Sequence, residues 1–337
     1  MMAIWKIGPA LAMGNTVVIK PASTTPLTTL ELGVLGKKAG IPDGVLNVIT
    51  GRGETVGSYL AAHEKIDMIS LTGNTETGKQ ISRLAVNNLK KVHLELGGKA
   101  PFIVFEDADL EAASEGAIVA SIVNSGQDCT AAARIYVQNK IYNKFIEKLK
   151  HKASKVKIGD PLNKNTDLGP LNSKQHLERV NNFVKNGVKQ GAKIYFKGNF
   201  PKKGYFMPIH IMVNVDQKSN LCQKEIFGPI LNILKFNTQD EVIQKANDVD
   251  YGLASSVWTK DIKKAFNVSN KLKFGEVWIN DHLPLVSEMP HGGVKQSGHG
   301  RDLSVYALEE YSNVKHIYVD LSGKARKPWH YTVYGKP

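Results

Sequence analysis

The chain has 337 residues, of which 42% are hydrophobic and 22% charged, a composition typical of a soluble globular protein long enough for two domains. The formal net charge is +13, but the basic residues are scattered and not interleaved with aromatic residues, so nucleic-acid binding is not expected. The 2 cysteines match neither a disulfide framework nor a zinc motif, and no apolar run approaches the roughly 20 residues of a membrane span, so we expect a cytoplasmic protein without a metal site.

The first hundred residues alternate between β-branched runs and helical patterns. The expected strands cover 15–20, 45–50, 66–72, 91–96 and 102–107, and the expected helices cover 25–40, 54–64 and 76–88. Such alternation builds a mostly parallel sheet with helices on both faces. Ligands of these sheets bind beyond the carboxyl ends of the strands. We therefore predict an α/β fold with its ligand site at that edge.

Two glycine-containing loops follow expected strands. "TGRG" at 50–53 precedes Gly57, and "TGNTETG" at 72–78 opens a helix. Free main-chain N–H groups at a helix N-terminus bind phosphate, so either loop is suited to a pyrophosphate. Neither loop has the G-x-G-x-x-G spacing of the common dinucleotide fingerprint. Taken alone, each loop is better explained as a tight turn between strand and helix than as a phosphate site.

Glu95 is a carboxylate in an otherwise apolar expected strand, and Gly97 and Gly98 follow it. Paired glycines mark a sharp turn or a close backbone approach. A buried carboxylate is costly unless it has a partner or a task, and burial raises its pKa towards the range of a general base. The sequence leaves open a general base and a salt-bridged strand residue.

A helix is expected over 109–126, with Asp109 at its N-terminus and Gly126 ending it. Cys129 then lies in a turn that offers main-chain N–H groups to a developing oxyanion. Most free cysteines are inert core residues, which is the competing interpretation. A thiol, a carboxylate and a dinucleotide-type sheet together point to aldehyde oxidation through a thiohemiacetal and a thioester.

Seven motifs in chain order resemble the aldehyde dehydrogenase superfamily. They are "GNTVVIKPAS", "LTGNTETGK", "LELGGKAPFIVFEDADL", "NSGQDCTAAAR", "GDPL…DLGPL", "EIFGPIL" and "GGVKQSGHGRD". The resemblance implies a Rossmann-like dinucleotide-binding domain and an α/β catalytic domain. It also implies that Cys129 is the nucleophile and that Glu95 is the base for the deacylating water.

The same resemblance implies the cofactor contacts, with NAD or NADP as the cofactor. Lys20 and Ser23 resemble the readers of the adenosine ribose, and Glu225 and Phe227 resemble the residues that hold the nicotinamide ribose and ring. The remaining implied contacts are Gly53, Gly57, Gly73, Asn74, Gly78 and Leu96. Many NAD-preferring members have Glu at the position of Ser23, so NADP stays open.

The substrate class is indicated by the Gln-Asp-Cys order and by residues 278–302, which resemble the branch of the family that oxidises 4-aminobutyraldehyde, an aldehyde of putrescine degradation. Asp128, Asp281 and Glu288 are acids suited to attract an ammonium group. Solvated loop acids are the alternative for each of the three.

The resemblance divides the chain into a partial NAD(P)-binding domain at 1–98, a catalytic domain at 99–302 and a C-terminal segment at 303–337. That segment contains an expected oligomerisation strand, "VKHIYVDL", and a tail expected to be a disordered extension. The resemblance starts after the family's N-terminal third, which carries an Asn oxyanion donor and most of an assembly hairpin. Loss of one such donor costs about 10²–10³ in kcat, so an impaired dinucleotide-binding fragment is the alternative function.

Overall fold

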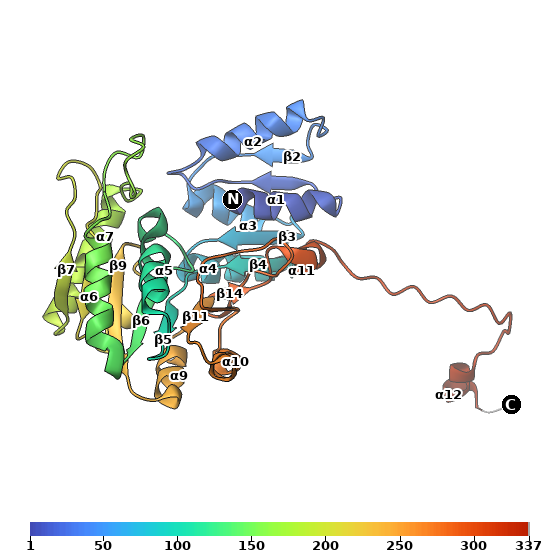
Figure 1. Ribbon diagram of the computed structural model, residues 1–337. Helices are drawn as coiled ribbons and strands as arrows, with labels where there is room; N and C mark the ends of the chain where they lie inside the picture. The colour runs from blue at the N-terminus through green and yellow to red at the C-terminus, as the bar shows by residue number, and fades with distance from the viewer. Residues whose placement is uncertain (336–337) are drawn as a thin grey trace.

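The computed structural model describes residues 1–335 and shows two neighbouring α/β units followed by an extended C-terminal segment (Figure 1). The first unit is formed by the N-terminal residues, and the second contains the largest sheet of the protein. Among residues 1–335, no helix combines the length and apolarity needed to cross a membrane.

The first unit follows the alternation expected from the sequence. Its elements are α1 (Met2–Ala12), β1 (Val17–Ile19), α2 (Leu27–Lys38), β2 (Leu46–Val48), η1 (Gly53–Gly57), α3 (Ser58–Ala62), β3 (Met68–Thr72), α4 (Thr75–Ala85), η2 (Val86–Asn88) and β4 (Lys91–Glu95). β1 pairs with β2 and β3 pairs with β4, both in parallel. The strands expected at 15–20, 45–50, 66–72 and 91–96 are present with shorter bounds and form two small sheets instead of one, whereas the strand expected at 102–107 lies at 100–104 in the larger sheet. The three expected helices are present with shifted bounds, and α1 was not predicted.

A sheet of seven strands, in the order β12-β11-β5-β6-β9-β8-β7, forms the second unit. Its strands are β5 (Ala100–Val104), β6 (Ala132–Gln138), β7 (Lys193–Lys197), β8 (His210–Val213), β9 (Ile230–Phe236), β11 (Ala254–Trp258) and β12 (Glu276–Ile279). Its helices are α5 (Leu110–Ile122), η3 (Val123–Gly126), η4 (Asn139–Ile141), α6 (Tyr142–Ala153), α7 (Lys174–Lys189), α8 (Asn220–Gln223), α9 (Gln239–Asn247) and α10 (Ile262–Lys271). The pairings are parallel except that of β7 with β8.

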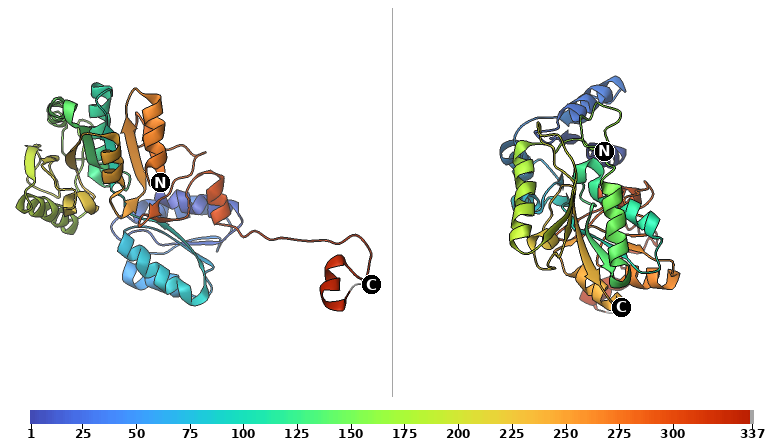
Figure 2. Two further views of the ribbon diagram at one scale, coloured as in Figure 1. Left: turned by 90° about the horizontal axis from the view of Figure 1, so that it is seen from below. Right: turned by 60° about the vertical axis from the view of Figure 1, so that its left-hand side comes forward.

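Apolar side chains cover both faces of this sheet, as the helices on its two sides in Figure 2 indicate. All five residues of β5 are buried, which is the pattern of a strand covered on both faces. Phe102 and Val104 pack in the cluster that contains α5 and α6, while Ile103 packs in the cluster that contains α9 and α10. This core fixes the strand ends that carry the site.

Helix α5 begins as expected but ends earlier. Asp109 caps it by accepting hydrogen bonds from the N–H groups of Glu111 and Ala112, at 2.9 and 3.1 Å. The helix ends at Ile122 and not at Gly126, because the residues at 124–126 have positive φ angles and cannot continue a right-handed helix. The turn that carries Cys129 is therefore positioned by three left-handed residues.

The sequence-based division of the chain is crossed by one strand. β14 (Gly298–His299) follows the whole seven-stranded sheet in sequence, yet it pairs with β4 of the first unit in an antiparallel arrangement. Two short strands, β10 (Tyr251–Gly252) and β13 (Val294–Lys295), form a separate antiparallel pair. The domains at 1–98, 99–302 and 303–337 remain a prediction, with β14 lying beside the first of them.

The C-terminal segment differs from the prediction. After α11 (Ser304–Glu310), residues 313–321 adopt no regular structure, because the strand expected at 314–321 has no neighbouring strand to pair with among residues 1–335. Pairing with a second copy stays a prediction. The expected disordered tail instead contains η5 (Pro328–His330) and α12 (Tyr331–Tyr334), which lie away from the body of the protein in Figures 1 and 2.

Candidate active site

Hydrogen bonds hold the turn that carries Cys129 in place. Asp128 Oδ1 accepts bonds from the Thr130 N–H and hydroxyl groups, both at 2.7 Å. His282 Nε2 donates to the Thr130 carbonyl at 2.8 Å, and burial lowers the pKa of His282 to about 4, so the ring is neutral near pH 7. The sequence analysis missed this role of His282, since nothing local links it to a residue 152 positions away.

Gly98 lies in the loop between β4 and β5, and it allows this loop to pass directly against the Cys129 turn. A Cβ atom at Gly98 would lie 2.0 Å from the carbonyl oxygen of Cys129. The close backbone approach expected from the paired glycines is therefore present, and it brings the Glu95 strand to the Cys129 turn.

Replacing Gly98 with Ala is expected to displace the Cys129 turn and to destabilise the fold by about 1–3 kcal/mol through overpacking. Thermal unfolding measures the loss of stability. Gly8→Ala is the matched control, because a Cβ there meets no atom within 4 Å. Equal stability of the two variants would contradict the importance of this contact.

The environment of Cys129 keeps its thiol protonated. The residue is half-buried, and burial raises the pKa of the thiol well above its ordinary value. The negative charges of Asp128, Glu225 and Glu95 raise it further, in that order. Since the thiolate is the nucleophile, this thiol must lose its proton to a nearby base when it reacts. The three carboxylates that act on the thiol are the chain's own candidates for that task.

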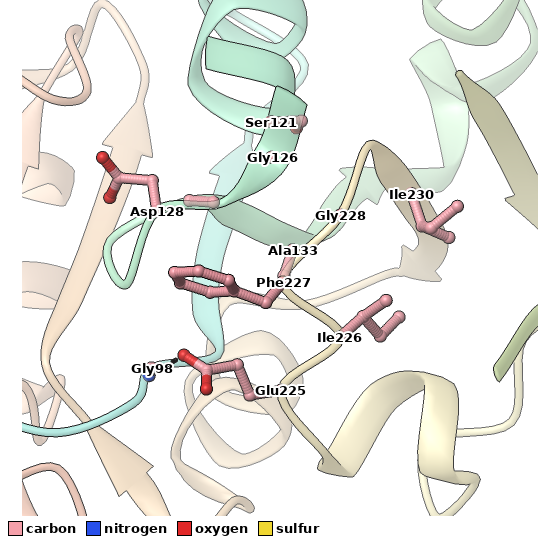
Figure 3. A pocket seen from close by; sticks show the side chains of 11 residues that line it. Gly98, Ser121, Gly126, Asp128, Ala133, Glu225, Ile226, Phe227, Gly228 and Ile230 are labelled. Atoms are coloured by element: carbon pink, nitrogen blue, oxygen red, sulfur yellow. Dashed lines mark hydrogen bonds between the residues drawn. The ribbon is translucent and has the colours of Figure 1, made fainter. Parts of the chain in front are cut away.

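Glu225 lies against the backbone between Glu95 and Cys129. Its Oε1 accepts a hydrogen bond from the Gly98 N–H at 2.9 Å, and burial raises the pKa of the carboxyl group. Phe227 has a φ of 62°, and its carbonyl oxygen accepts a 2.7 Å bond from His176 Nε2. Figure 3 shows Glu225 and Phe227 pointing into one pocket near Asp128, where the enclosed space is about 10 Å³, room for a single water.

Glu95 ends β4, opposite Thr72 of β3 and Gly298 of β14. The residue is 3% exposed, and neither carboxyl oxygen has a hydrogen-bond partner within residues 1–335. Burial raises the pKa of Glu95 to about 8, which is the direction expected for a general base that works near neutral pH.

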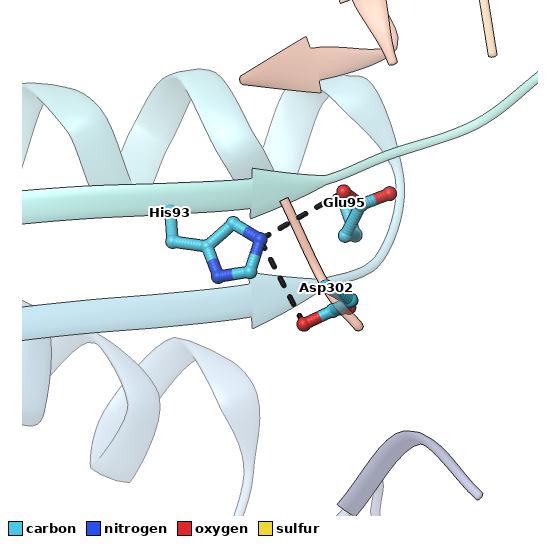
Figure 4. Close-up of side chains that lie close together, drawn as sticks. All are labelled: His93, Glu95 and Asp302. Carbon is cyan, nitrogen blue, oxygen red and sulfur yellow. Dashed lines mark ion pairs between the residues drawn. The ribbon is translucent and has the colours of Figure 1, made fainter. Parts of the chain in front are cut away.

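A group of charged and titratable side chains surrounds Glu95. His93 Nε2 lies 3.7 Å from Glu95 Oε1 and 3.9 Å from Asp302 Oδ1, as Figure 4 shows, and Lys6 Nζ lies 2.6 Å from Asp302 Oδ2. His93 was missed, although its i, i+2 spacing to Glu95 places both on one face of the strand. Asp302 and Lys6 carried no local signal, because they meet only in the folded chain.

The residues expected to bind the adenosine ribose follow the carboxyl ends of β1 and β2. Lys20 Nζ donates to the carbonyl oxygen of Pro21 at 2.6 Å, and its Cε lies 3.7 Å from where a Cβ of Gly57 would be. The hydroxyl of Ser23, an exposed residue, donates to the Gly51 carbonyl at 3.2 Å. The structure thus brings Lys20, Ser23 and the loop at 51–57 to one place, with Gly53 exposed.

The residues expected near the pyrophosphate follow β3 and open α4. Asn74 caps α4, its side chain accepting a 2.9 Å bond from the Thr77 N–H. The Gly73 N–H donates to the Glu95 carbonyl at 3.0 Å, so this loop is attached to the end of β4. Gly78 packs on Leu96, where a Cβ would lie 2.8 Å from the leucine methyl groups. The site roles of these residues remain predictions.

Comparison with known proteins gives the family. The Aldehyde dehydrogenase family profile matches residues 1–317. Betaine aldehyde dehydrogenase of Bacillus subtilis is 45% identical over 323 residues, which are 94% of this chain and 66% of that protein. Aldehyde dehydrogenase 1A1 of Mesocricetus auratus is 43% identical over 326 residues, 96% of this chain and 65% of that protein.

Solved structures agree. Betaine aldehyde dehydrogenase from Staphylococcus aureus in complex with NAD+ has a TM-score of 0.91 and 41% identity, covering 96% of this chain and 66% of that one. A mutant of aldehyde dehydrogenase from Bacillus cereus has a TM-score of 0.93 and 45% identity, and the match covers 94% of this chain and 65% of that one. The chain spans about 65–66% of the length of these relatives. Sequence, fold and the order of the site motifs agree, and the chain belongs to the aldehyde dehydrogenase family.

Proposed function

We propose that this chain oxidises an aldehyde to a carboxylic acid with NAD or NADP, using Cys129 as the nucleophile and Glu95 as the general base. The main support is that a half-buried thiol, Cys129, lies close enough to Glu95 and Glu225 for the charges of both to raise its pKa. The relatives that match the chain are named as aldehyde dehydrogenases, and one was solved with NAD+.

The residues at the strand ends fit a dinucleotide. Lys20 and Ser23 lie together at the ends of β1 and β2, where they would contact the adenosine ribose, and Gly73 and Asn74 are exposed at the N-terminus of α4, where a pyrophosphate is favoured. Glu225 and Phe227 would contact the nicotinamide ribose and ring, which are too large for the pocket of about 10 Å³ beside these side chains and would therefore lie outside it. When bound, the nicotinamide ring supplies the hydride acceptor.

The side chains of the site then have separate tasks. The Cys129 thiol loses its proton to a neighbouring carboxylate, and the sulfur bonds to the aldehyde carbon to give a thiohemiacetal. The Cys129 N–H donates to the resulting oxyanion. Once the hydride has left, the acyl group is held on sulfur as a thioester. Glu95 takes a proton from the water that adds to the thioester carbon, the C–S bond breaks, and the acid is released.

For the substrate we propose 4-aminobutyraldehyde or a related aminoaldehyde. Asp128 Oδ1 is held by Thr130, which fixes the carboxylate beside Cys129 and presents its negative charge to a cationic substrate. Asp281 and Glu288 are exposed, as solvated loop acids are, and therefore support the proposal less.

The proposed function is tested by NAD(P)H formation with 4-aminobutyraldehyde and with the neutral butyraldehyde of similar length, using each cofactor in turn. Turnover with both aldehydes, and a higher kcat/KM for the amine, would support the activity and the substrate class. Equal kcat/KM values would contradict the aminoaldehyde proposal alone. Cofactor binding without turnover of either aldehyde would contradict the activity and favour the impaired dinucleotide-binding fragment.

Replacing Ser23 with Glu is expected to shift cofactor preference towards NAD by about tenfold or more. A carboxylate at this exposed position accepts from the ribose hydroxyl groups and repels a 2′-phosphate. The Kd values of both cofactors, measured by fluorescence titration, give the ratio without any need for turnover. Ser23→Gln is the uncharged control, and an unchanged ratio in Ser23→Glu would refute the assignment of position 23.

A further inference from the structure

The imidazole ring of His291 lies between Glu95 and a second buried acid, Glu276. His291 Nδ1 lies 2.6 Å from Glu276 Oε1, and His291 Nε2 lies 3.6 Å from Glu95 Oε2. The side chains of His291 and Glu95 are 2% and 4% exposed, and that of Glu276 is 11% exposed. The imidazole thus stands between two carboxylates in a largely water-free part of the protein.

This position favours the doubly protonated ring. His291 Nδ1 donates a hydrogen bond to Glu276 Oε1, and the Nε2 side of the ring faces the Glu95 carboxyl group at ion-pair distance, so a negative charge on either side attracts the protonated ring. Burial by itself lowers the pKa of His291, but the hydrogen bond to Glu276 and the charges of Glu276, Glu95 and Asp302 outweigh it, so the pKa is raised above its ordinary value. His291 therefore carries positive charge at a higher pH than a free histidine.

Other elements also bring charged or titratable groups to Glu95. They are Lys6 from α1, His93 from β4, Arg301 and Asp302 from the segment after β14, and Glu276 from β12 through His291. Lys6 is bonded to Asp302, and burial lowers the pKa of His93 to about 3, so that ring stays neutral. Among the positive charges that lower the pKa of Glu95, that of His291 has the largest effect. It opposes the burial that raises the pKa of Glu95.

We propose that Glu276 and His291 form a positioning dyad for Glu95, in which Glu276 holds the His291 imidazolium and the positive charge of that ring beside Glu95 favours the ionised form of its carboxyl group. This inference rests on the proposed role of Glu95 as the base of deacylation. Neither residue touches the substrate, and both act through Glu95. The dyad places a positive charge 3.6 Å from a buried carboxyl group whose oxygens have no hydrogen-bond partner within residues 1–335.

The direct test is a pH titration of Glu95 by NMR in protein labelled with ¹³C at the Glu side-chain carboxyl, with the signal assigned by its loss in Glu95→Gln. In Glu276→Gln the imidazolium loses its anionic acceptor, so the Glu95 midpoint is expected to rise by about one pH unit. His291→Phe removes the cation and should raise the midpoint at least as far. The double variant should match His291→Phe alone, because Glu276 acts only through His291.

Two further variants separate this role from a general effect on folding. Glu276→Asp keeps the charge and should restore part of the shift. His210→Phe removes a buried histidine of β8, whose Nδ1 contacts the Pro208 carbonyl, and should leave the Glu95 midpoint unchanged. An unchanged midpoint in both Glu276→Gln and His291→Phe, or an equal shift in His210→Phe, would overturn the proposal.

The pH profile of steady-state turnover links the dyad to deacylation. A raised Glu95 midpoint means that the base form exists only at higher pH, so the rising limb in Glu276→Gln should move up by the same amount. A shifted midpoint with an unmoved limb would overturn the link to catalysis. The NMR titration needs no turnover, so a failure of the proposed enzyme activity is recognised separately from a failure of the dyad.

Discussion

Replacing Cys129 with Ala is expected to reduce aldehyde oxidation by at least about 10⁴-fold while leaving cofactor affinity nearly unchanged. In the proposed mechanism the thiol forms the covalent bond to the aldehyde carbon, and the other cysteine, Cys222, is fully buried in α8. Steady-state NAD(P)H formation measures the first effect, and fluorescence titration of the cofactor measures the second.

Cys222→Ala is the matched control for this variant. Its sulfur lies 3.7 Å from Gln217 Oε1 in the cluster that packs on α9 and α10, away from the Cys129 turn. We expect a modest loss of stability and turnover within a few-fold of the parent protein. Turnover in Cys129→Ala at the level of Cys222→Ala would exclude Cys129 as the nucleophile.

Replacing Glu95 with Gln is expected to slow steady-state turnover by about 10²–10⁴-fold while a single rapid burst of NAD(P)H remains. The amide has nearly the shape of the carboxyl group but accepts no proton, so the thioester forms and is not hydrolysed. Rapid-mixing absorbance gives the burst amplitude, and mass spectrometry detects the acyl group on Cys129.

The role of Glu95 as the base of deacylation is tested a second time by the pH dependence of turnover in the parent protein. Since the pKa of Glu95 is raised to about 8, its base form appears as the pH rises through that value, and deacylation should accelerate in the same window. Glu95→Gln should lose this limb. Glu111→Gln, an exposed α5 acid bonded to Lys148 and Lys152, should keep it. A Glu95→Gln protein with normal steady-state turnover would refute the role of Glu95 as base.

Local sequence patterns were sufficient for much of the fold. The alternation of β-branched runs with helical periods predicted β1 to β4 and α2 to α4 of the first unit but not α1, and Asp109 predicted the start of α5. These signals act within a few residues, through side-chain alternation and the capping of free N–H groups. The end of α5 was wrong, because Gly126 packs against Gly228, where a Cβ would lie 2.3 Å from backbone, and the left-handed turn begins before it.

The folded chain shows which of the predicted site residues lie close together and what their side chains contact. Chain order placed Glu95 within a strand and Cys129 after a helix, and the folded chain shows that the loop at Gly98 packs against the Cys129 turn. Asn74 was expected as a phosphate contact, and its side chain serves as a helix cap. The segment at 314–321 has the alternation of a strand but finds no partner strand in the part of the chain that the structure describes, and without pairing it does not form a strand.

The sequence by itself determined the α/β alternation, the loops at the strand ends and the two residues, Cys129 and Glu95, on which the chemistry is proposed to depend. Only the tertiary structure decided which groups surround Glu95. Lys6 and Asp302 meet across 296 residues, and His291 reaches Glu276 across 15. The physical reason is that periodicity and capping are local properties, whereas burial and the charges that set a pKa depend on segments packed together from the whole chain.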